Sequence, residues 1–99
     1  MQRMTFRIRE FAIVVEPHTL YPNQARVYYG PLELGRLTDN TRTCTVQIEC
    51  LFDPGMDAIT IQGRLDVRVE TACDRMLQHL EKMALLRHTP PTLETVVPE

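Results

Sequence analysis

The sequence predicts an α+β fold, with a mainly antiparallel sheet of about four to five strands followed by one C-terminal helix. In the middle of the chain, apolar and polar residues alternate with a period of two, which is typical of half-buried strands. In the last third, apolar residues recur at intervals of three and four, which is typical of one face of a helix. A chain of 99 residues has the size of a single domain.

The clearest candidate strands flank the turn sequence Asp53-Pro54-Gly55-Met56. The first, Arg42–Asp53, places on one face Cys44, Val46, Ile48, Cys50 and Phe52. The second, Asp57–Glu70, places on one face Ile59, Ile61, Leu65, Val67 and Val69. Because proline and glycine favour a tight turn, we expect a long antiparallel hairpin. Gly63 lies in line with the apolar face, where we expect a bulge or a close approach by the helix.

The N-terminal third contains shorter strands. The alternation of apolar residues changes phase near Arg9-Glu10, so this part forms one bulged strand or two short ones. Two further strands, Gln24–Tyr29 and Leu32–Leu37, are separated by Gly30-Pro31. The polar stretch 38–41 predicts a turn.

The helix is expected to begin within two residues of Thr71 and to end before Pro90, since Thr71 can cap it and proline stops it. Its apolar positions include Leu77 and Leu80, which we expect to be buried against the sheet. The domain then spans residues 1–89. The last ten residues, 90–99, lack any period and are expected to be an extended or disordered tail.

The composition of the chain indicates its cellular compartment and limits the kind of partner it can bind. No apolar run approaches the length of about 20 residues that a membrane helix needs, and the N-terminus lacks the apolar block of a signal peptide. We therefore expect a cytoplasmic protein that does not enter a membrane. Three cysteines, Cys44, Cys50 and Cys73, are expected to be free thiols in the core, without a disulfide. The net charge of −2 gives no support to general phosphate neutralisation.

The sequence offers little for catalysis, for a cofactor or for a metal. Serine is absent, and the histidines are not placed beside a cysteine or another nucleophile. Cys73, Met76 and His79 recur at every third residue and could face a soft metal. Core packing of Cys73 and Met76, with His79 at the boundary, is the favoured interpretation. We expect no enzyme, no cofactor and no bound metal.

The exposed face of the second candidate strand alternates in charge along Arg64, Asp66, Arg68 and Glu70, and Arg75 follows in the helix. Such a ladder is usually a solvated face with cross-strand pairs. The functional interpretation is an arginine stripe that meets RNA phosphates or an acidic protein. Tyr28 or Tyr29, beside Arg26, could stack on bases, although one of two adjacent tyrosines in a strand must face inward.

The run Gly63–Leu77, GRLDVRVETACDRML, resembles the signature of the YceD-like family of bacteria and plastids. Members of that family have a strand that begins with glycine and then a Cys-Asp-Arg-Cys-Leu box. Here Cys73, Asp74, Arg75 and Leu77 match the box, and Met76 replaces its second cysteine. The resemblance implies a role in ribosome assembly or in the accumulation of large-subunit ribosomal RNA.

Two functions are therefore carried forward. The first is a non-enzymatic accessory domain that resembles ribosome-assembly proteins, with partner-binding candidates Arg64, Arg68, Asp74, Arg75 and Tyr28. The second is a protein-interaction or assembly subunit, of viral or mobile-element origin for instance, that docks through a sheet edge or a helix face. An edge strand would also allow a homo-oligomer.

Overall fold

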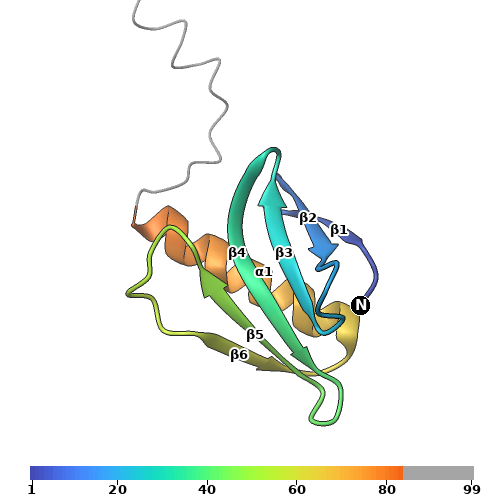
Figure 1. Cartoon of the computed structure of the whole chain (residues 1–99). Coiled ribbons are helices and arrows are strands. Elements are labelled where there is room, and N and C mark those ends of the chain that lie inside the picture. Colours follow the sequence, from blue (N-terminus) through green and yellow to red (C-terminus); the bar gives the residue numbers. More distant parts are fainter. Residues whose placement is uncertain (84–99) are drawn as a thin grey trace, which may run out of the picture.

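The computed structural model describes residues 1–83, which form an antiparallel sheet and one helix (Figure 1). The sheet has six strands in chain order, one or two more than the sequence predicted. They are β1 (Met4–Ile8), β2 (Phe11–Pro17), β3 (Gln24–Tyr29), β4 (Leu32–Asn40), β5 (Thr45–Cys50) and β6 (Ile59–Gln62). The helix α1 spans Leu65–Lys82 and so ends before Pro90, as predicted. The predicted tail, 90–99, lies outside the described residues.

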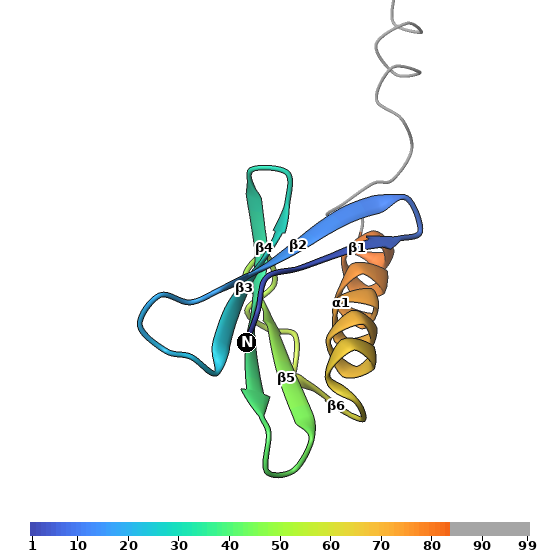
Figure 2. The ribbon, with the colours of Figure 1, turned by 90° about the vertical axis from the view of Figure 1, so that its right-hand side faces the viewer.

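Each strand pairs with the next one along the chain, and the helix covers one face of the sheet. Figure 2 shows the sheet curving around the helix, with the β1–β2 hairpin arching toward the C-terminal half of α1. The other face of the sheet is not covered by the helix. Among residues 1–83, no helix is both long and apolar enough to cross a membrane.

The phase change near Arg9 separates two strands. Arg9 and Glu10 have φ angles of 45° and 75° and form a two-residue turn between β1 and β2. Positive φ at both central residues is the geometry that matches the twist of a tight hairpin. The apolar alternation therefore restarts after the turn, at Phe11, which is fully buried.

The fourth strand is longer than the sequence predicted, and the predicted turn over 38–41 is wrong. Thr38, Asp39 and Asn40 pair with residues of β5, and the chain turns only after Asn40. The Asn40 side-chain oxygen accepts a hydrogen bond from the Arg42 N–H. Asp39 is thereby placed in a buried strand position, where a carboxylate needs a partner.

The second hairpin strand is shorter than predicted, and the helix begins earlier. β6 ends at Gln62, and α1 begins at Leu65 instead of near Thr71. The reason lies in β5, because Cys44 has a φ of 55° and belongs to the preceding turn. The last ladder bond runs from the Gly63 N–H to the Cys44 carbonyl. Residues after Gly63 have no strand left to pair with and enter the helix.

The core lies between the helix and the concave face of the sheet. Leu77 and Leu80 are fully buried, as predicted. Met76 of the helix packs directly over Gly35, where an added Cβ would lie 2.6 Å from Met76 Sδ and 2.5 Å from the Glu49 carbonyl of β5. The expectation that the helix approaches Gly63 is wrong, because a Cβ there would meet nothing within 4 Å. Gly63 instead has a φ of 147° at the junction between strand and helix.

All three cysteines are free, but only two lie in the core. Cys50 and Cys73 are buried, and burial raises the pKa of the Cys73 thiol to about 12. Cys44 is exposed because it lies in the turn between β4 and β5. The predicted core position of Cys44 is therefore wrong. Phe52 was expected on the same inward face and is also exposed, in the loop that follows β5.

Candidate functional site

The predicted arginine stripe is not assembled on one face. Arg64 lies at the N-terminus of the helix, where its guanidinium pairs with Asp66 at 3.1 Å. Arg68 is buried, because it lies in the first turns of α1 instead of on a strand. Arg75 is exposed on the helix. The three guanidinium groups therefore do not form a continuous surface for phosphate.

Arg68 has a structural partner that the sequence interpretation missed. Its Nε and Nη2 donate to the two carboxylate oxygens of Asp39 at 2.8 and 3.0 Å, and its Nη1 donates to the Gly63 carbonyl. The two side chains are 5% and 6% exposed. Hydrogen bonding to Asp39 raises the pKa of Arg68 further above its ordinary value. This bidentate pair joins the start of the helix to the middle of the sheet.

Two residues of the Cys73-Asp74-Arg75 segment make contacts within the domain. Cys73 is buried in the core, and Asp74 accepts a hydrogen bond from Arg9 Nε at 3.0 Å. Arg9 also pairs with Glu81 and so links the β1–β2 turn to two turns of the helix. Of the three box residues, Arg75 alone is exposed.

The three helix residues that could face a soft metal make other contacts in the structure. Cys73 and Met76 are fully buried, and His79 Nε2 lies 2.7 Å from the Asp53 carboxylate. The hydrogen bond with His79 is the largest cause of the lowered pKa of Asp53. Within residues 1–83, the structure brings together no group of three side chains that could hold a metal ion.

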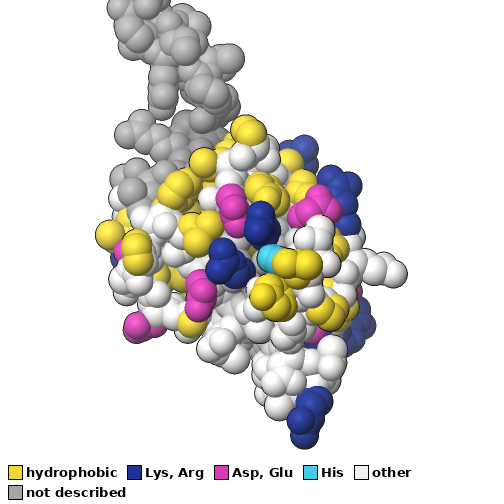
Figure 3. All heavy atoms as spheres, viewed as in Figure 1, with side chains coloured by type: hydrophobic (Ala, Val, Ile, Leu, Met, Phe, Trp, Pro, Cys, Tyr) yellow, Lys and Arg dark blue, Asp and Glu magenta, His cyan; other side chains and the backbone are white. Residues whose placement is uncertain are grey.

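The uncovered face of the sheet is polar and mixed in charge. Arg26 on β3 and Arg36 on β4 are directly opposite each other, and Arg36 is opposite Glu49 on β5. In Figure 3, basic side chains lie side by side near the middle of this face, with acidic side chains around them. Tyr28 lies on this face, while the Tyr29 ring packs edge-on against Phe11 in the core. Both tyrosines are half-buried, and Tyr28 is the one that lies beside Arg26 on the uncovered face.

The edge strand β6 has backbone groups that point away from the sheet. The ladder bond between Gly63 and Cys44, together with the antiparallel register, directs the N–H and C=O groups of Ile59 and Ile61 toward β5. Those of Thr60 and Gln62 must then point outward. No backbone hydrogen bond from another described residue reaches them. Their side chains are exposed and uncharged.

A hollow lies where β6 begins. Pairing between β5 and β6 stops at Ile48 and Ile59, and the loop 51–58 bows away from the end of β5. The resulting hollow has a volume of about 310 Å³ and is lined by Glu49, Cys50, Leu51, Pro54, Met56 and Ala58. Leu51 of this lining is an exposed apolar side chain, as is Phe52, which follows it in the chain. In Figure 3, hydrophobic side chains gather on the side of the molecule that carries this loop.

Sequence reasoning named a sheet edge as a docking route but did not identify these groups. The predicted strand continued through Thr60 and Gln62 to Glu70. For this reason the prediction missed both the end of the edge strand at Gln62 and the start of the helix at Leu65. The glycine at position 63 was the available indication, since a glycine in a strand pattern can also mark the point where the strand ends.

Comparisons with known proteins give no family for this chain. No protein-family model, no curated protein and no solved structure matches it.

Proposed function

We propose that this chain is a non-enzymatic binding domain whose β6 edge accepts an extended segment of a protein partner. The observation that carries the proposal is the pair of outward backbone groups at Thr60 and Gln62. An added strand would satisfy these groups with main-chain hydrogen bonds, which is how sheet edges capture peptides.

The hollow beside β6 would supply specificity to such a partner. It lies directly before the strand, because Ala58 lines it and Ile59 begins β6. Five of its six lining residues are uncharged, and its charged member is Glu49. A segment running along β6 could place an apolar side chain there. In strand addition, pockets of this kind select the side chains of the incoming segment.

A ribosomal-RNA partner receives less support from the described residues. Arg68, one of the residues proposed to contact phosphate, is buried and bound to Asp39. Arg64 is paired with Asp66. The chain as a whole carries a net charge of −2. Protein capture through β6 therefore accounts for more of the geometry than phosphate contacts do.

The proposal is tested with Thr60→Pro, which removes an outward N–H that bonds to no other strand. Proline is tolerated at such edge positions, so the domain should keep its fold, as checked by circular dichroism and thermal unfolding. Affinity capture from the native host is then compared for the wild-type domain and the variant, with bound protein and bound RNA both analysed. We expect the specific protein partner to be lost with Thr60→Pro.

The matched control is Thr5→Pro on the opposite edge. Thr5 also directs its N–H away from its neighbour, because β1 pairs with β2 through Met4, Phe6 and Ile8. This variant should retain the partner. Equal capture by wild type and Thr60→Pro would refute the proposal, as would recovery of RNA in place of a protein. Pairing of β6 with β6 of a second copy would appear as a dimer that Thr60→Pro dissociates, and would identify the partner as this chain.

A further inference from the structure

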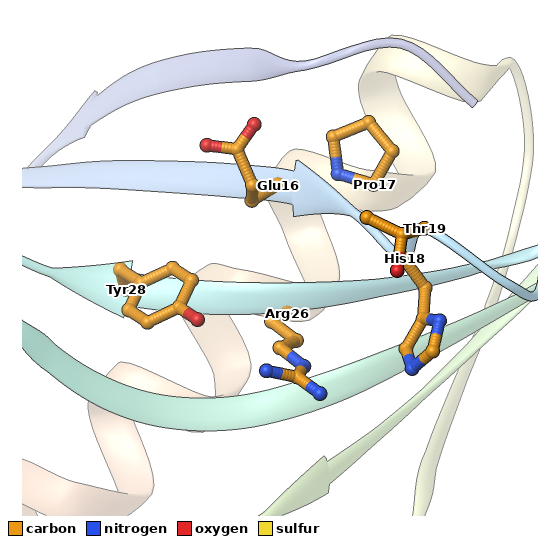
Figure 4. Close-up of a pocket in the computed structure, with 6 residues that line it drawn as sticks. All are labelled: Glu16, Pro17, His18, Thr19, Arg26 and Tyr28. Atoms are coloured by element: carbon orange, nitrogen blue, oxygen red, sulfur yellow. The ribbon is translucent and has the colours of Figure 1, made fainter.

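A second hollow lies on the uncovered face of the sheet, near β2 and β3 and three strands away from β6. It has a volume of about 160 Å³ and is lined by Glu16, Pro17, His18, Thr19, Arg26 and Tyr28 (Figure 4). Figure 4 shows the Arg26 guanidinium between the Tyr28 and His18 side chains. The lining thus combines a cation with hydroxyl and imidazole groups that can donate hydrogen bonds.

The Arg26 guanidinium is only weakly engaged. Its contact with Glu33 is 3.9 Å long, at the outer limit of an ion pair. Glu16, the acidic residue that lines the hollow, is opposite Arg26 in the register of β2 and β3 but binds Arg3 at 3.2 Å. In Figure 4 the Glu16 carboxylate points away from Arg26. Arg36, directly opposite Arg26 in the next strand, adds a second positive charge nearby. Like charges at directly opposed positions are destabilising.

The remaining groups are arranged as donors. His18 Nδ1 accepts hydrogen bonds from the backbone N–H groups of Leu20 and Tyr21 at 3.0 and 3.3 Å. In the neutral ring the proton is therefore on Nε2, which can donate outward. The Tyr28 and Thr19 hydroxyl groups make no hydrogen bond with the described residues. Four side chains that line this one hollow therefore carry a hydrogen-bond donor.

We propose that this hollow binds a small oxyanion, a phosphate or carboxylate group, with Arg26 as its charged anchor. The planar guanidinium can donate two parallel hydrogen bonds to either group. Tyr28, Thr19 and His18 complete the donor set around it. This site is independent of the β6 edge, so either one can fail without the other.

The test is an NMR titration of the whole chain with inorganic phosphate and, separately, with acetate, at neutral pH and constant ionic strength. We expect saturable shifts of the Arg26 side-chain Nε–H and of the His18 ring signals. Arg26→Gln should weaken binding by at least about tenfold, because a hydrogen bond to a charged group contributes on the order of 1.5–3 kcal/mol. Tyr28→Phe should weaken it by less.

The matched control is Arg42→Gln, which removes the same charge from the exposed turn after β4 and should leave binding unchanged. Saturation by phosphate, by acetate or by both supports the site and shows which group it accepts. Two results would overturn the proposal. One is an affinity of Arg26→Gln equal to that of wild type. The other is a non-saturating response spread over all arginines, since that is general electrostatic screening.

Discussion

The two edges of the sheet differ in how they are joined to the rest of the molecule. A two-residue turn joins β1 to β2. The residues of β1 whose backbone groups point away from the sheet are Thr5 and Arg7. β6 is reached through the eight-residue loop 51–58, and its outward positions are Thr60 and Gln62. Charged side chains on an edge discourage pairing with other chains. The comparison therefore marks β6 as the more receptive edge.

Different ion pairs also tie the two ends of the helix to the sheet. Toward its C-terminus, Asp74 and Glu81 contact Arg9 of the β1–β2 turn, whose side chain is 38% exposed. Near its N-terminus, Arg68 pairs with Asp39 on β4, and both side chains are almost completely buried. Exposed pairs contribute little to stability, whereas removing one member of a buried pair leaves an uncompensated charge. The same chemistry thus has a large structural role at one end and a small one at the other.

The largest effect is expected from Asp39→Ala. The buried Arg68 guanidinium would lose both carboxylate hydrogen bonds, at a cost of about 3–5 kcal/mol in the free energy of unfolding. Urea unfolding measures the change. The double variant Asp39→Ala/Arg68→Met is the control, and it should recover much of the loss because no buried charge remains. A loss below about 1 kcal/mol for Asp39→Ala would show that the pair is not buried in solution.

A smaller loss is expected from Gly35→Ala, midway between the two edges. The new Cβ would meet the Glu49 carbonyl and Met76 Sδ at 2.5 and 2.6 Å, so the backbone of the neighbouring strand β5 and the Met76 side chain must both shift. Overpacking of this kind costs about 1–3 kcal/mol. Gly55→Ala is the matched control, because a Cβ there meets only the Asp53 side chain, at 3.4 Å. Equal stability of the two variants would contradict the close contact.

The loop before β6 should respond to acid through Asp53. Its pKa is lowered mainly by the hydrogen bond with His79, so it lies below the value of about 3.9 for an unfolded chain. The stabilisation is therefore complete above the unfolded pKa and is lost as pH falls through the folded one. An NMR titration of the carboxyl carbon measures this pKa, and His79→Gln should raise it toward the ordinary value. An unchanged Asp53 titration in His79→Gln would mean that the contact does not form.

The smallest effect is expected from Arg9→Gln at the β1 end. The ion pairs of Arg9 lie at the surface, where such pairs contribute about 0–1 kcal/mol and are screened by salt. Thermal unfolding at low and high salt measures the contribution, which should shrink as salt increases. A loss above about 2 kcal/mol would make the two ends of the helix equivalent and remove the contrast drawn above.

The sequence was sufficient for features that depend on local pattern. Alternation identified the β5–β6 pairing and the burial of Val46 and Ile48, and the helical period identified Leu77 and Leu80. The prediction of a strand was wrong between Leu65 and Glu70. The segment LDVRVE alternates as a strand does, but its residues also fit the first turns of the helix that follows. The choice depends on where β5 ends, which is a tertiary constraint.

The buried ion pair and the outward groups of β6 were also beyond local pattern. Asp39 was read as part of a turn, and its pairing with Arg68 joins residues 29 positions apart. The outward groups at Thr60 and Gln62 belong to the backbone, so no side-chain pattern reveals them. At the hollow beside Arg26, the sequence indicated Tyr28 but not His18 and Thr19, which follow β2 and line the same hollow.

The central claim, that β6 is the docking edge, is tested most directly by amide hydrogen exchange. Exchange is measured by NMR for the free domain and for its complex with the captured partner. In the free domain, the Thr60 and Gln62 amides should exchange quickly while those of Ile59 and Ile61 are protected by β5. In the complex, Thr60 and Gln62 should become protected, and Thr5 and Arg7 should not change. Protection of Thr5 and Arg7 with no change at Thr60 and Gln62 would contradict the account.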